Sequence, residues 1–495
     1  MSSSTSEDRC VSTGCAGLND ILGGGLTRDH LYLIEGDPGT GKTTLALQFL
    51  LAGVAAGEKG VYITLSESPK ELGEVAESHN WSLDGISLIE MAPHSSGDIA
   101  EDEYTVFHPS DVELGDTVKS VLERMEALNP ARVVFDSLSE LRMLARESLR
   151  YRRQILALKR YFAGKDCTVL LLDDRTAEGN DLQLQSIAHG VIMLHSLERE
   201  FGAKRRRLEV RKMRGSKFRE GFHDYTIERG GVQVYPRLVA AEHRPPVELV
   251  SVQSGIKQLD DLFSGGIDFG TSTLLIGPAG TGKSTIALQY AYAAAQRGQH
   301  AAVFTFDETL QTLFRRCATI GMDLQEQVRQ GRLSVEQVDP AELSPGEFVS
   351  RVRASVSDKN TRVVVIDSLN GFLNAMPGEA FLILQLHEML SFLSQQGVAT
   401  IMTMAQHGMF GTMMISPVDV SYVADSVLLF RYFEAEGAIH KALSVVKKRS
   451  GGHESSIRKL SFSPRGIEVG PPLKDFHGVL TGVPSPLPNG RKTES

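Results

Sequence analysis

A chain of 495 residues is long enough for two or three domains, each with its own buried core. Apolar residues make up 41% and charged residues 23%, as is ordinary for soluble globular proteins, and the net charge of −9 argues against a nucleic-acid coat protein. The four cysteines are scattered, and the Ser-rich first residues form no apolar signal segment. We therefore expect a cytoplasmic protein with reduced cysteines and no membrane association.

Two stretches fit the phosphate-loop pattern, in which two glycines bracket four residues and are followed by Lys and then Ser or Thr. The glycines let successive backbone N–H groups point at a polyphosphate, and the helix that follows adds its partial positive charge. The lysines reach the terminal phosphates of ATP in such sites. We predict ATP contacts from Gly36, Pro38, Gly39, Thr40, Gly41, Lys42, Thr43, Thr44, Gly277, Ala279, Gly280, Thr281, Gly282, Lys283, Ser284 and Thr285.

The chain contains the same domain twice. Gly36 recurs as Gly277, and Gly24 recurs as Gly265 at the same spacing. Apolar runs alternate with helical patterns in each half, which is typical of a parallel sheet flanked by helices. The sequence therefore predicts an α/β protein with two tandem domains, residues 1–240 and 241–469, followed by an extended tail at residues 470–495.

An aspartate ends one apolar run in each half, Asp136 in the first and Asp367 in the second. A buried carboxylate is costly unless it meets a cation or hydrogen-bond donors. Capping of the next helix is the alternative role, but a phosphate loop in the same half favours a metal. We therefore predict one Mg²⁺ site at Thr43 with Asp136 and another at Ser284 with Asp367.

A glutamate follows the apolar run after each phosphate loop, Glu67 in the first half and Glu308 in the second. A carboxylate there can orient and deprotonate a water or a hydroxyl for attack on the γ-phosphate. It can also stabilise the start of the following helix, and the two roles are compatible. We predict a catalytic role for both glutamates.

A Lys-x-Arg sequence occurs late in each half, with Lys212 and Arg214 in the first and Lys447 and Arg449 in the second. Such side chains could reach the nucleotide of a neighbouring subunit and stabilise the charge of the transition state. A solvated basic strand is the alternative. The basic run at residues 204–207 lacks interleaved aromatic residues, so we interpret it as a solvent-exposed hairpin or a subunit contact.

Together these motifs make the chain similar to the KaiC-like ATPases, a family with two tandem RecA-like P-loop domains, each a mostly parallel twisted sheet flanked by helices. The resemblance extends to about Leu487 and includes the sequence from Ser66 to Pro69. It implies a two-tiered homohexamer with ATP and Mg²⁺ at the subunit interfaces, slow ATP hydrolysis and autophosphorylation in the second ring. It also implies a KaiB-like or other signalling protein as partner, with neither nucleic acid nor a membrane.

The chain departs from the family pattern at the paired catalytic glutamates, which appear as Ser66-Glu67 and Asp307-Glu308. If the first position supplies the general base, Glu67 has to substitute for Ser66 in the first half. Asp307 keeps the negative charge, but its side chain is about one methylene shorter than that of the family's glutamate. The resemblance thus adds Asp307 to the catalytic candidates.

The Ser-Thr phosphoacceptors of the family align with Ser421-Tyr422, where the serine alone is retained. We predict phosphorylation at Ser421, with Ser416 as a second candidate; an ordinary loop hydroxyl is the alternative. Two other functions stay open: a RecA/RadA-like DNA-dependent ATPase, and an ATP-assembled scaffold with little catalysis, which Ser66 favours. The fold does not decide between them, but the acidic charge argues against DNA.

Overall fold

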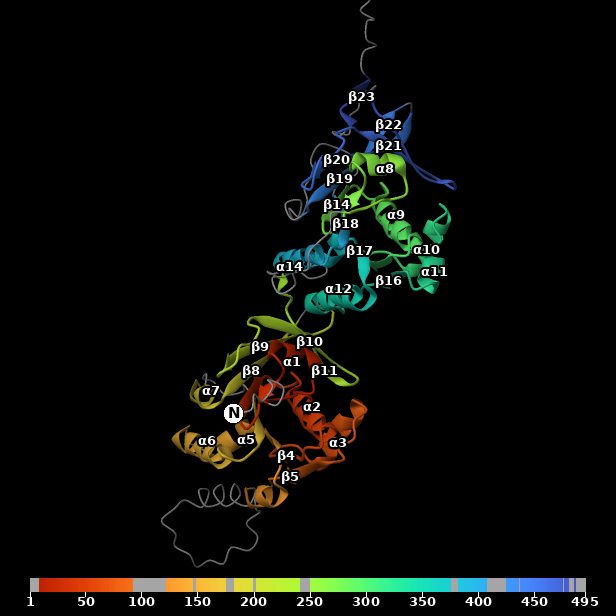
Figure 1. Cartoon of the computed structure of the whole chain (residues 1–495). Coiled ribbons are helices and arrows are strands. Elements are labelled where there is room, and N and C mark those ends of the chain that lie inside the picture. Colours follow the sequence, from red (N-terminus) through yellow and green to blue (C-terminus); the bar gives the residue numbers. More distant parts are fainter. Residues whose placement is uncertain are drawn as a thin grey trace, which may run out of the picture. The chain divides into compact units, whose positions relative to one another are not determined.

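The fold is that of a computed structural model of the chain (Figure 1). It describes residues 9–91, 122–145, 148–174, 182–198, 202–240, 250–374, 382–406, 424–435, 437–474, 476–479 and 485–486. The chain divides into two compact units, Met1–Arg237 and Leu238–Ser495. Leu238 and Ala240, which fall in the first domain as expected from the sequence, are buried in a hydrophobic core of the second unit.

The sheet of the first unit has, within the described residues, nine strands in the order β11-β10-β9-β8-β3-β7-β6-β4-β5. The strands from β8 to β5 in this order are parallel, and those from β8 to β11 are antiparallel. Parallel neighbours need long crossover connections, which the helices supply. The strands are β3 (Leu31–Gly36), β4 (Gly60–Thr64), β5 (Ile86–Glu90), β6 (Arg132–Asp136), β7 (Thr168–Asp174), β8 (Gly190–Leu197), β9 (Arg205–Met213), β10 (Phe222–Glu228) and β11 (Gly231–Tyr235).

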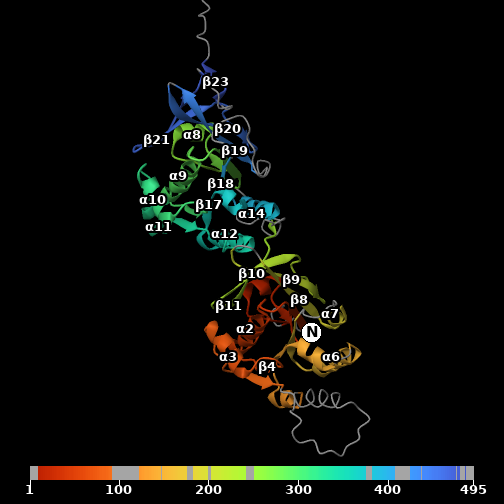
Figure 2. The ribbon, with the colours of Figure 1, turned by 180° about the vertical axis from the view of Figure 1, so that it is seen from behind.

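Helices cover both faces of this sheet, and Figures 1 and 2 show α2 and α6 on opposite sides of it. Because side chains alternate along a strand, Tyr32 and Ile34 face one layer while Leu31 and Leu33 face the other. The first layer contains α1 (Ala16–Ile21), α2 (Lys42–Ala55) and α3 (Pro69–Ser78), and the second contains α5 (Leu138–Ala145), α6 (Ser148–Phe162) and α7 (Leu182–Ile187).

The second unit repeats this sheet strand for strand, in the order β16-β15-β17-β18-β14-β19-β20-β21-β22. The duplication and the α/β class expected from the sequence are thereby confirmed, with a mostly parallel sheet in each half. The strands are β14 (Ser272–Gly277), β15 (His300–Thr305), β16 (Leu333–Gln337), β17 (Thr361–Asp367), β18 (Ala399–Ala405), β19 (Ser426–Ala435), β20 (Ala438–Lys448), β21 (Arg458–Ser463) and β22 (Gly466–Pro472).

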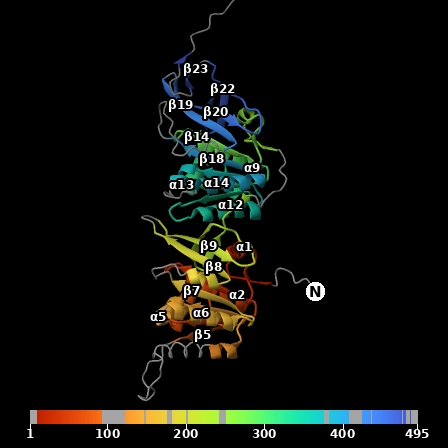
Figure 3. The same ribbon diagram turned by 90° about the vertical axis from the view of Figure 1, so that its left-hand side faces the viewer.

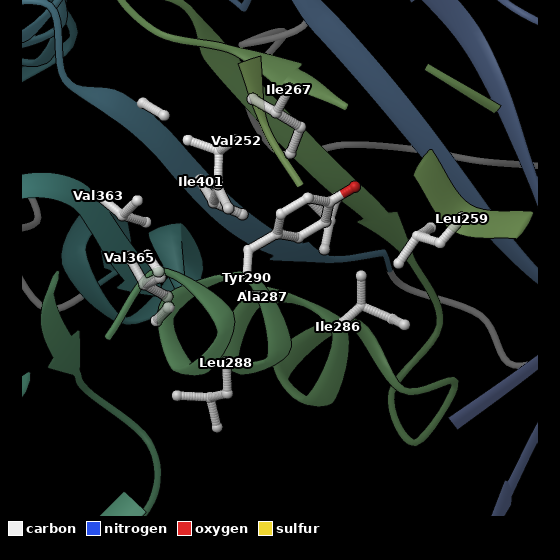
Figure 4. Close-up of a cluster of buried hydrophobic side chains, with 14 of the residues drawn as sticks. Val252, Leu259, Ile267, Ile286, Ala287, Leu288, Tyr290, Val363, Val365 and Ile401 are labelled. Carbon is white, nitrogen blue, oxygen red and sulfur yellow. The ribbon is translucent and has the colours of Figure 1, made fainter. Parts of the chain in front are cut away.

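Two helical layers cover this sheet as well. Figure 4 shows Ile286, Ala287 and Tyr290 of the helix after the second phosphate loop facing Val365 and Ile401 of the sheet. Figure 3 shows α12 and α14 on the side of the second sheet that faces the viewer. One layer contains α8 (Lys257–Leu262), α9 (Lys283–Gln296), α10 (Leu310–Ala318) and α11 (Leu324–Arg329), and the other contains α12 (Pro345–Lys359), α13 (Leu369–Asn374) and α14 (Leu382–Gln395).

Short strand pairs complete the structure. Part of the region expected to form an extended tail is ordered: Val479 is buried beside Phe433 and Ala442, and β22 continues to Pro472. The short pairs are β1 (Cys10–Val11) with β2 (Leu26–Thr27), β12 (Ser251–Val252) with β13 (Ile267–Asp268), and β23 (Phe476–His477) with β24 (Ser485–Pro486).

The basic run at residues 204–207 is less exposed than a solvated hairpin. Lys204 is exposed, but Arg205 is buried where β9 begins, between β8 and β10. Arg207 Nε lies 3.3 Å from Asp224 Oδ1 on the neighbouring strand. The run does form a hairpin with β8, but because β9 is an interior strand the expected solvent exposure is wrong for Arg205; a subunit contact stays a prediction.

A buried arginine ties the first sheet to its helical layer. Arg132 opens β6 with its side chain 2% exposed, and its Nε donates to Glu58 Oε2 at 2.5 Å. Its Nη1 donates to the carbonyl oxygens of Ser12 and Phe49, each at 2.7 Å. A buried charge is tolerated when it is paired in this way, whereas an unpaired one is strongly destabilising.

We expect Glu58→Ala to lower the free energy of unfolding of the first unit by about 3–5 kcal/mol, because it leaves Arg132 buried without its carboxylate. Urea unfolding followed by tryptophan fluorescence measures this, since the single tryptophan, Trp81, lies in the first unit. Glu74→Ala removes an exposed i,i+4 partner of Lys70 and should cost less than about 0.5 kcal/mol. Equal losses in the two variants would contradict the prediction.

Candidate functional site

In each half a glycine-rich loop joins the central strand of the sheet to a helix. Gly39 and Gly41 have φ angles of 78° and 91°, and Gly280 and Gly282 have 76° and 105°. Glycine adopts these left-handed conformations without strain. At Gly282 a Cβ atom would lie 2.3 Å from Phe462 Cζ, so a larger residue would also collide with β21. The loop conformation therefore depends on the glycines of the motif.

The lysine of each loop is buried and folds back over it. Lys42 Nζ donates to the carbonyl oxygens of Gly36 and Asp37 at 2.8 and 3.1 Å. Lys283 Nζ makes the two equivalent bonds at 2.8 and 2.7 Å. Burial lowers the pKa of Lys283 to about 8, against the attraction of Asp367, which raises it. Each ammonium group is thus held at the loop before any phosphate arrives.

The structure brings together both members of each predicted magnesium pair. Thr43 Oγ1 donates to Asp136 Oδ2 at 3.1 Å, and Ser284 Oγ donates to Asp367 Oδ1 at 2.9 Å. Burial raises the pKa of both carboxyl groups, and the hydroxyl donors oppose that shift. A hydroxyl and a carboxylate oxygen suit Mg²⁺, which takes few protein ligands and completes its shell with phosphates and water.

Two residues that sequence reasoning missed hold these aspartates from the side. The Tyr62 hydroxyl donates to Asp136 Oδ2, and the Thr403 hydroxyl donates to Asp367 Oδ1. Tyr62 comes from β4 and Thr403 from β18, which are different neighbours of the aspartate strand. No motif marks either residue, because the contact depends on the order of strands in the sheet.

Glu67 lies directly beyond β4, close to the first loop. Its backbone N–H donates to Thr64 Oγ1 at 2.9 Å, and the same hydroxyl donates to the Glu67 carbonyl oxygen at 2.7 Å. Burial raises the pKa of the Glu67 carboxyl to about 7, and the charge of Asp136 adds to the shift. Its Oε2 is buried without a hydrogen-bond partner in the described part of the chain.

Other residues cap the helix that follows Glu67. Ser68 Oγ accepts from the Glu71 N–H at 3.3 Å, and Glu71 Oε2 accepts from the Ser68 N–H at 2.7 Å. These reciprocal bonds form a capping box at the start of α3. Ser68 and Glu71 therefore cap the helix, and Glu67 is not needed for that role. Its carboxylate is available to the phosphate loop.

The second half holds its glutamate differently. Arg316 of α10 binds both oxygens of Glu308, at 3.1 Å from Nε and 2.7 Å from Nη2. Its Nη1 also donates to Thr285 Oγ1 at 2.8 Å, which links the glutamate to the first turn of α9. Asp307 is exposed, and its Oδ2 accepts from Ser368 Oγ at 2.6 Å. Arg316 was not among the predicted site residues.

A cavity of about 360 Å³ opens beside the second loop. This volume falls in the usual range of small-molecule sites. Its cationic, hydroxyl and aromatic lining suits a phosphorylated ligand with a planar ring. The lining includes Lys283, Ser284, Thr285, Glu308, Arg316 and Phe462.

The Lys-x-Arg pairs lie away from the loop of their own half. The Arg214 N–H donates to the His189 carbonyl at 3.0 Å, and the His189 N–H donates to the Leu31 carbonyl at 2.8 Å. Arg214 is therefore level with the start of β3, whereas the loop leaves the end of β3 at Gly36, roughly 17 Å further along the strand. Lys212 Nζ donates to the Gln185 and Ala188 carbonyl oxygens at 2.7 and 2.8 Å.

The second half has the same arrangement. The Arg449 N–H donates to the Asp425 carbonyl at 3.0 Å, and the Asp425 N–H donates to the Ser272 carbonyl at 2.9 Å, where β14 begins. Lys447 Nζ donates to the Ala424 carbonyl at 2.6 Å. Neither pair is brought to its own phosphate loop.

Two further expectations concern the predicted phosphoacceptors and the lack of a membrane span. Ser421 and Ser416 lie outside the described residues. Within those residues, no helix has the length and apolar character needed to cross a bilayer.

Both halves thus present a P-loop lysine, a hydroxyl–aspartate pair and a strand-end glutamate at one edge of a mostly parallel sheet, which defines a tandem RecA-like P-loop protein. A model of the KaiC ATPase family matches residues 11–239 and 252–474. The chain belongs to this family of ATP-binding ATPases.

Several circadian clock proteins are similar to the chain over nearly its whole length. The circadian clock oscillator protein KaiC of Thermostichus vulcanus is 27% identical over 99% of this chain and 95% of the relative. KaiC of Synechococcus elongatus is 25% identical over 98% of this chain and 93% of the relative. The circadian clock protein KaiC3 of Synechocystis is 25% identical over 96% and 94%, respectively.

Proposed function

We propose that the chain forms a homohexamer that binds ATP and Mg²⁺ at its subunit interfaces, hydrolyses ATP slowly and phosphorylates itself in the second half. It would act in the cytoplasm as a signalling or clock-type hub with a KaiB-like or other signalling partner. The observation that carries the proposal is the full set of P-loop lysine, hydroxyl–aspartate pair and strand-end glutamate in each half. Its similarity to clock oscillator proteins supports the signalling role.

In the first half, Glu67 is proposed as the general base of hydrolysis. A water oxygen bonds to the γ-phosphorus while its proton passes to Glu67 and the bond to the ADP oxygen breaks. The unpartnered Oε2 and the raised pKa of about 7 support this role, because the carboxylate is free to accept a proton at neutral pH. Mg²⁺ at Thr43 and Asp136 would neutralise charge on the phosphate oxygens.

In the second half, Asp307 and Glu308 are proposed to activate a serine hydroxyl, Ser421 or Ser416. The serine oxygen bonds to the γ-phosphorus, its proton passes to a carboxylate, and ADP leaves. Arg316 fixes the Glu308 carboxylate beside Thr285, at the loop that would hold the phosphates. Ser284 and Asp367 would hold the second Mg²⁺.

Lys212 with Arg214, and Lys447 with Arg449, are proposed to act on the nucleotide of a neighbouring subunit. Their place at the far edge of the sheet supports this, because a residue about 17 Å along a strand from its own loop does not reach that loop's phosphates. The nucleotide site would then be complete only in the assembled ring.

Incubation of the chain with MgATP tests the proposed function. We expect slow phosphate release, a hexameric mass by sedimentation, and one phosphate at Ser421 or Ser416 by mass spectrometry. Lys283→Ala should remove the phosphoserine, since the lysine would hold the terminal phosphate. A large stimulation by single-stranded DNA would favour a DNA-dependent ATPase, and a hexamer without phosphate release would favour a scaffold.

The pH dependence of hydrolysis tests Glu67. In a Lys283→Ala background we expect the rate to rise with pH through about 7, because the carboxyl group must lose its proton before it can accept one. Glu67→Gln should lower the rate by about 10²–10⁴-fold and abolish this dependence. Ser66→Ala, one residue earlier, should leave the profile unchanged. Persistence of the rise in Glu67→Gln would assign the base to another group.

Mixed hexamers test the action of Arg214 between subunits. Glu67→Gln and Arg214→Ala, each in a Lys283→Ala background, should be nearly inactive alone. Co-assembly creates interfaces that combine an intact Glu67 with an intact Arg214, so random 1:1 mixing should restore about a quarter of the parental rate. No recovery in verified mixed hexamers would show that Arg214 acts within its own subunit or not at all.

A further inference from the structure

The two P-loop lysines have different neighbours, because the carboxylate of Asp174 lies beside Lys42. Asp174 is the last residue of β7 and lies opposite Gly36 in the parallel pairing of β7 with β3. Its Oδ1 is 2.6 Å from Lys42 Nζ, and its Oδ2 accepts from Ser139 Oγ at 3.3 Å. The Lys42 side chain is 8% exposed and that of Asp174 is 29% exposed, so water reaches the carboxylate of the ion pair but hardly its ammonium group.

In the described part of the second half, the equivalent position holds no carboxylate. The residue opposite Gly277, where β18 pairs with β14, is Ala405. Among the described residues, no carboxylate comes within ion-pair distance of Lys283, whose contacts are the loop carbonyl oxygens. The same position at the edge of the sheet is therefore charged in one half and apolar in the other.

We propose that Asp174 makes the first half bind nucleoside triphosphate more weakly than the second. This rests on the proposed role of both lysines as ligands of the terminal phosphates. A phosphate entering the first loop must replace Asp174 as the partner of Lys42, and the displaced carboxylate stays close enough to repel it. A phosphate entering the second loop meets an ammonium group that, among the described residues, has no carboxylate within ion-pair distance.

The surrounding charges strengthen the contrast. Asp136 and Glu67 lie at the same edge as Asp174, and the charges of Asp136 and Asp174 add to the effect of burial in raising the pKa of Glu67. In the second half Arg316 balances Glu308. In the first half, three carboxylates thus lie near the single lysine of the loop. Of these three, Asp174 can be replaced without removing the predicted base, Glu67, or the predicted magnesium ligand, Asp136.

Binding of a non-hydrolysable ATP analogue with Mg²⁺ to the full chain measures the effect. The first site is isolated in a Lys283→Ala background and the second in a Lys42→Ala background. Asp174→Asn keeps the size of the side chain and its contact with Ser139, and should tighten the first site about tenfold. The change also removes the carboxylate partner of the buried Lys42, so thermal unfolding without nucleotide is measured alongside, and the affinities are compared at a temperature where both chains are fully folded.

The reciprocal change supplies the matched control. Ala405→Asp should weaken the second site about tenfold, whereas Ala405→Asn, of the same shape without the charge, should not. If Asp174→Asn leaves the affinity of the first site unchanged, or if both Ala405 variants weaken the second site equally, this inference is wrong but the proposed function still stands. If neither Lys42→Ala nor Lys283→Ala loses a nucleotide-binding site, both the proposed function and this inference are wrong.

Discussion

The structure depends on the parallel arrangement of the central strands, which ends them all at the same edge of the sheet. In the first half this gathers Asp136, Glu67 and Asp174 around the single ammonium group of Lys42. Burial raises the pKa of Asp136 and of Glu67, and repulsion by neighbouring carboxylates adds to both shifts. The same concentration of charge suits a site for Mg²⁺ and polyphosphate, since both cations and phosphates can then find partners.

The two halves relieve this crowding in different ways. Tyr62 holds the aspartate from β4 in the first half, and Thr403 holds it from β18 in the second. Arg316 neutralises Glu308, while Val75 occupies the same place in α3, and Glu67 Oε2 has no hydrogen-bond partner among the described residues. One fold thus provides a free carboxylate near one phosphate loop and a clamped one near the other.

Spacing along the sequence predicted the duplicated fold and placed Thr43 beside Asp136 and Ser284 beside Asp367. The fold was predictable because the strand, loop and helix recur in fixed succession, and the aspartates reach the loops because each ends a parallel strand at the edge from which the loop leaves; the magnesium sites stay a prediction. Asp174 and Arg316 were not predicted, since their contacts depend on which strands are neighbours and on how a helix packs. The expected exposure of the basic run was wrong for the buried Arg205 for a related reason, because β9 is an interior strand, whereas Lys204 is exposed as expected.

The positions of the Lys-x-Arg pairs add a constraint on how such a protein could work. Arg214 and Arg449 lie at the edge of the sheet opposite the loops, level with the first residues of β3 and β14. If these arginines serve the neighbouring nucleotide, each subunit contributes one edge of its sheet as binding site and the other as activator. Hydrolysis in one subunit would then change the contacts of the next, so that nucleotide binding and subunit assembly become linked equilibria.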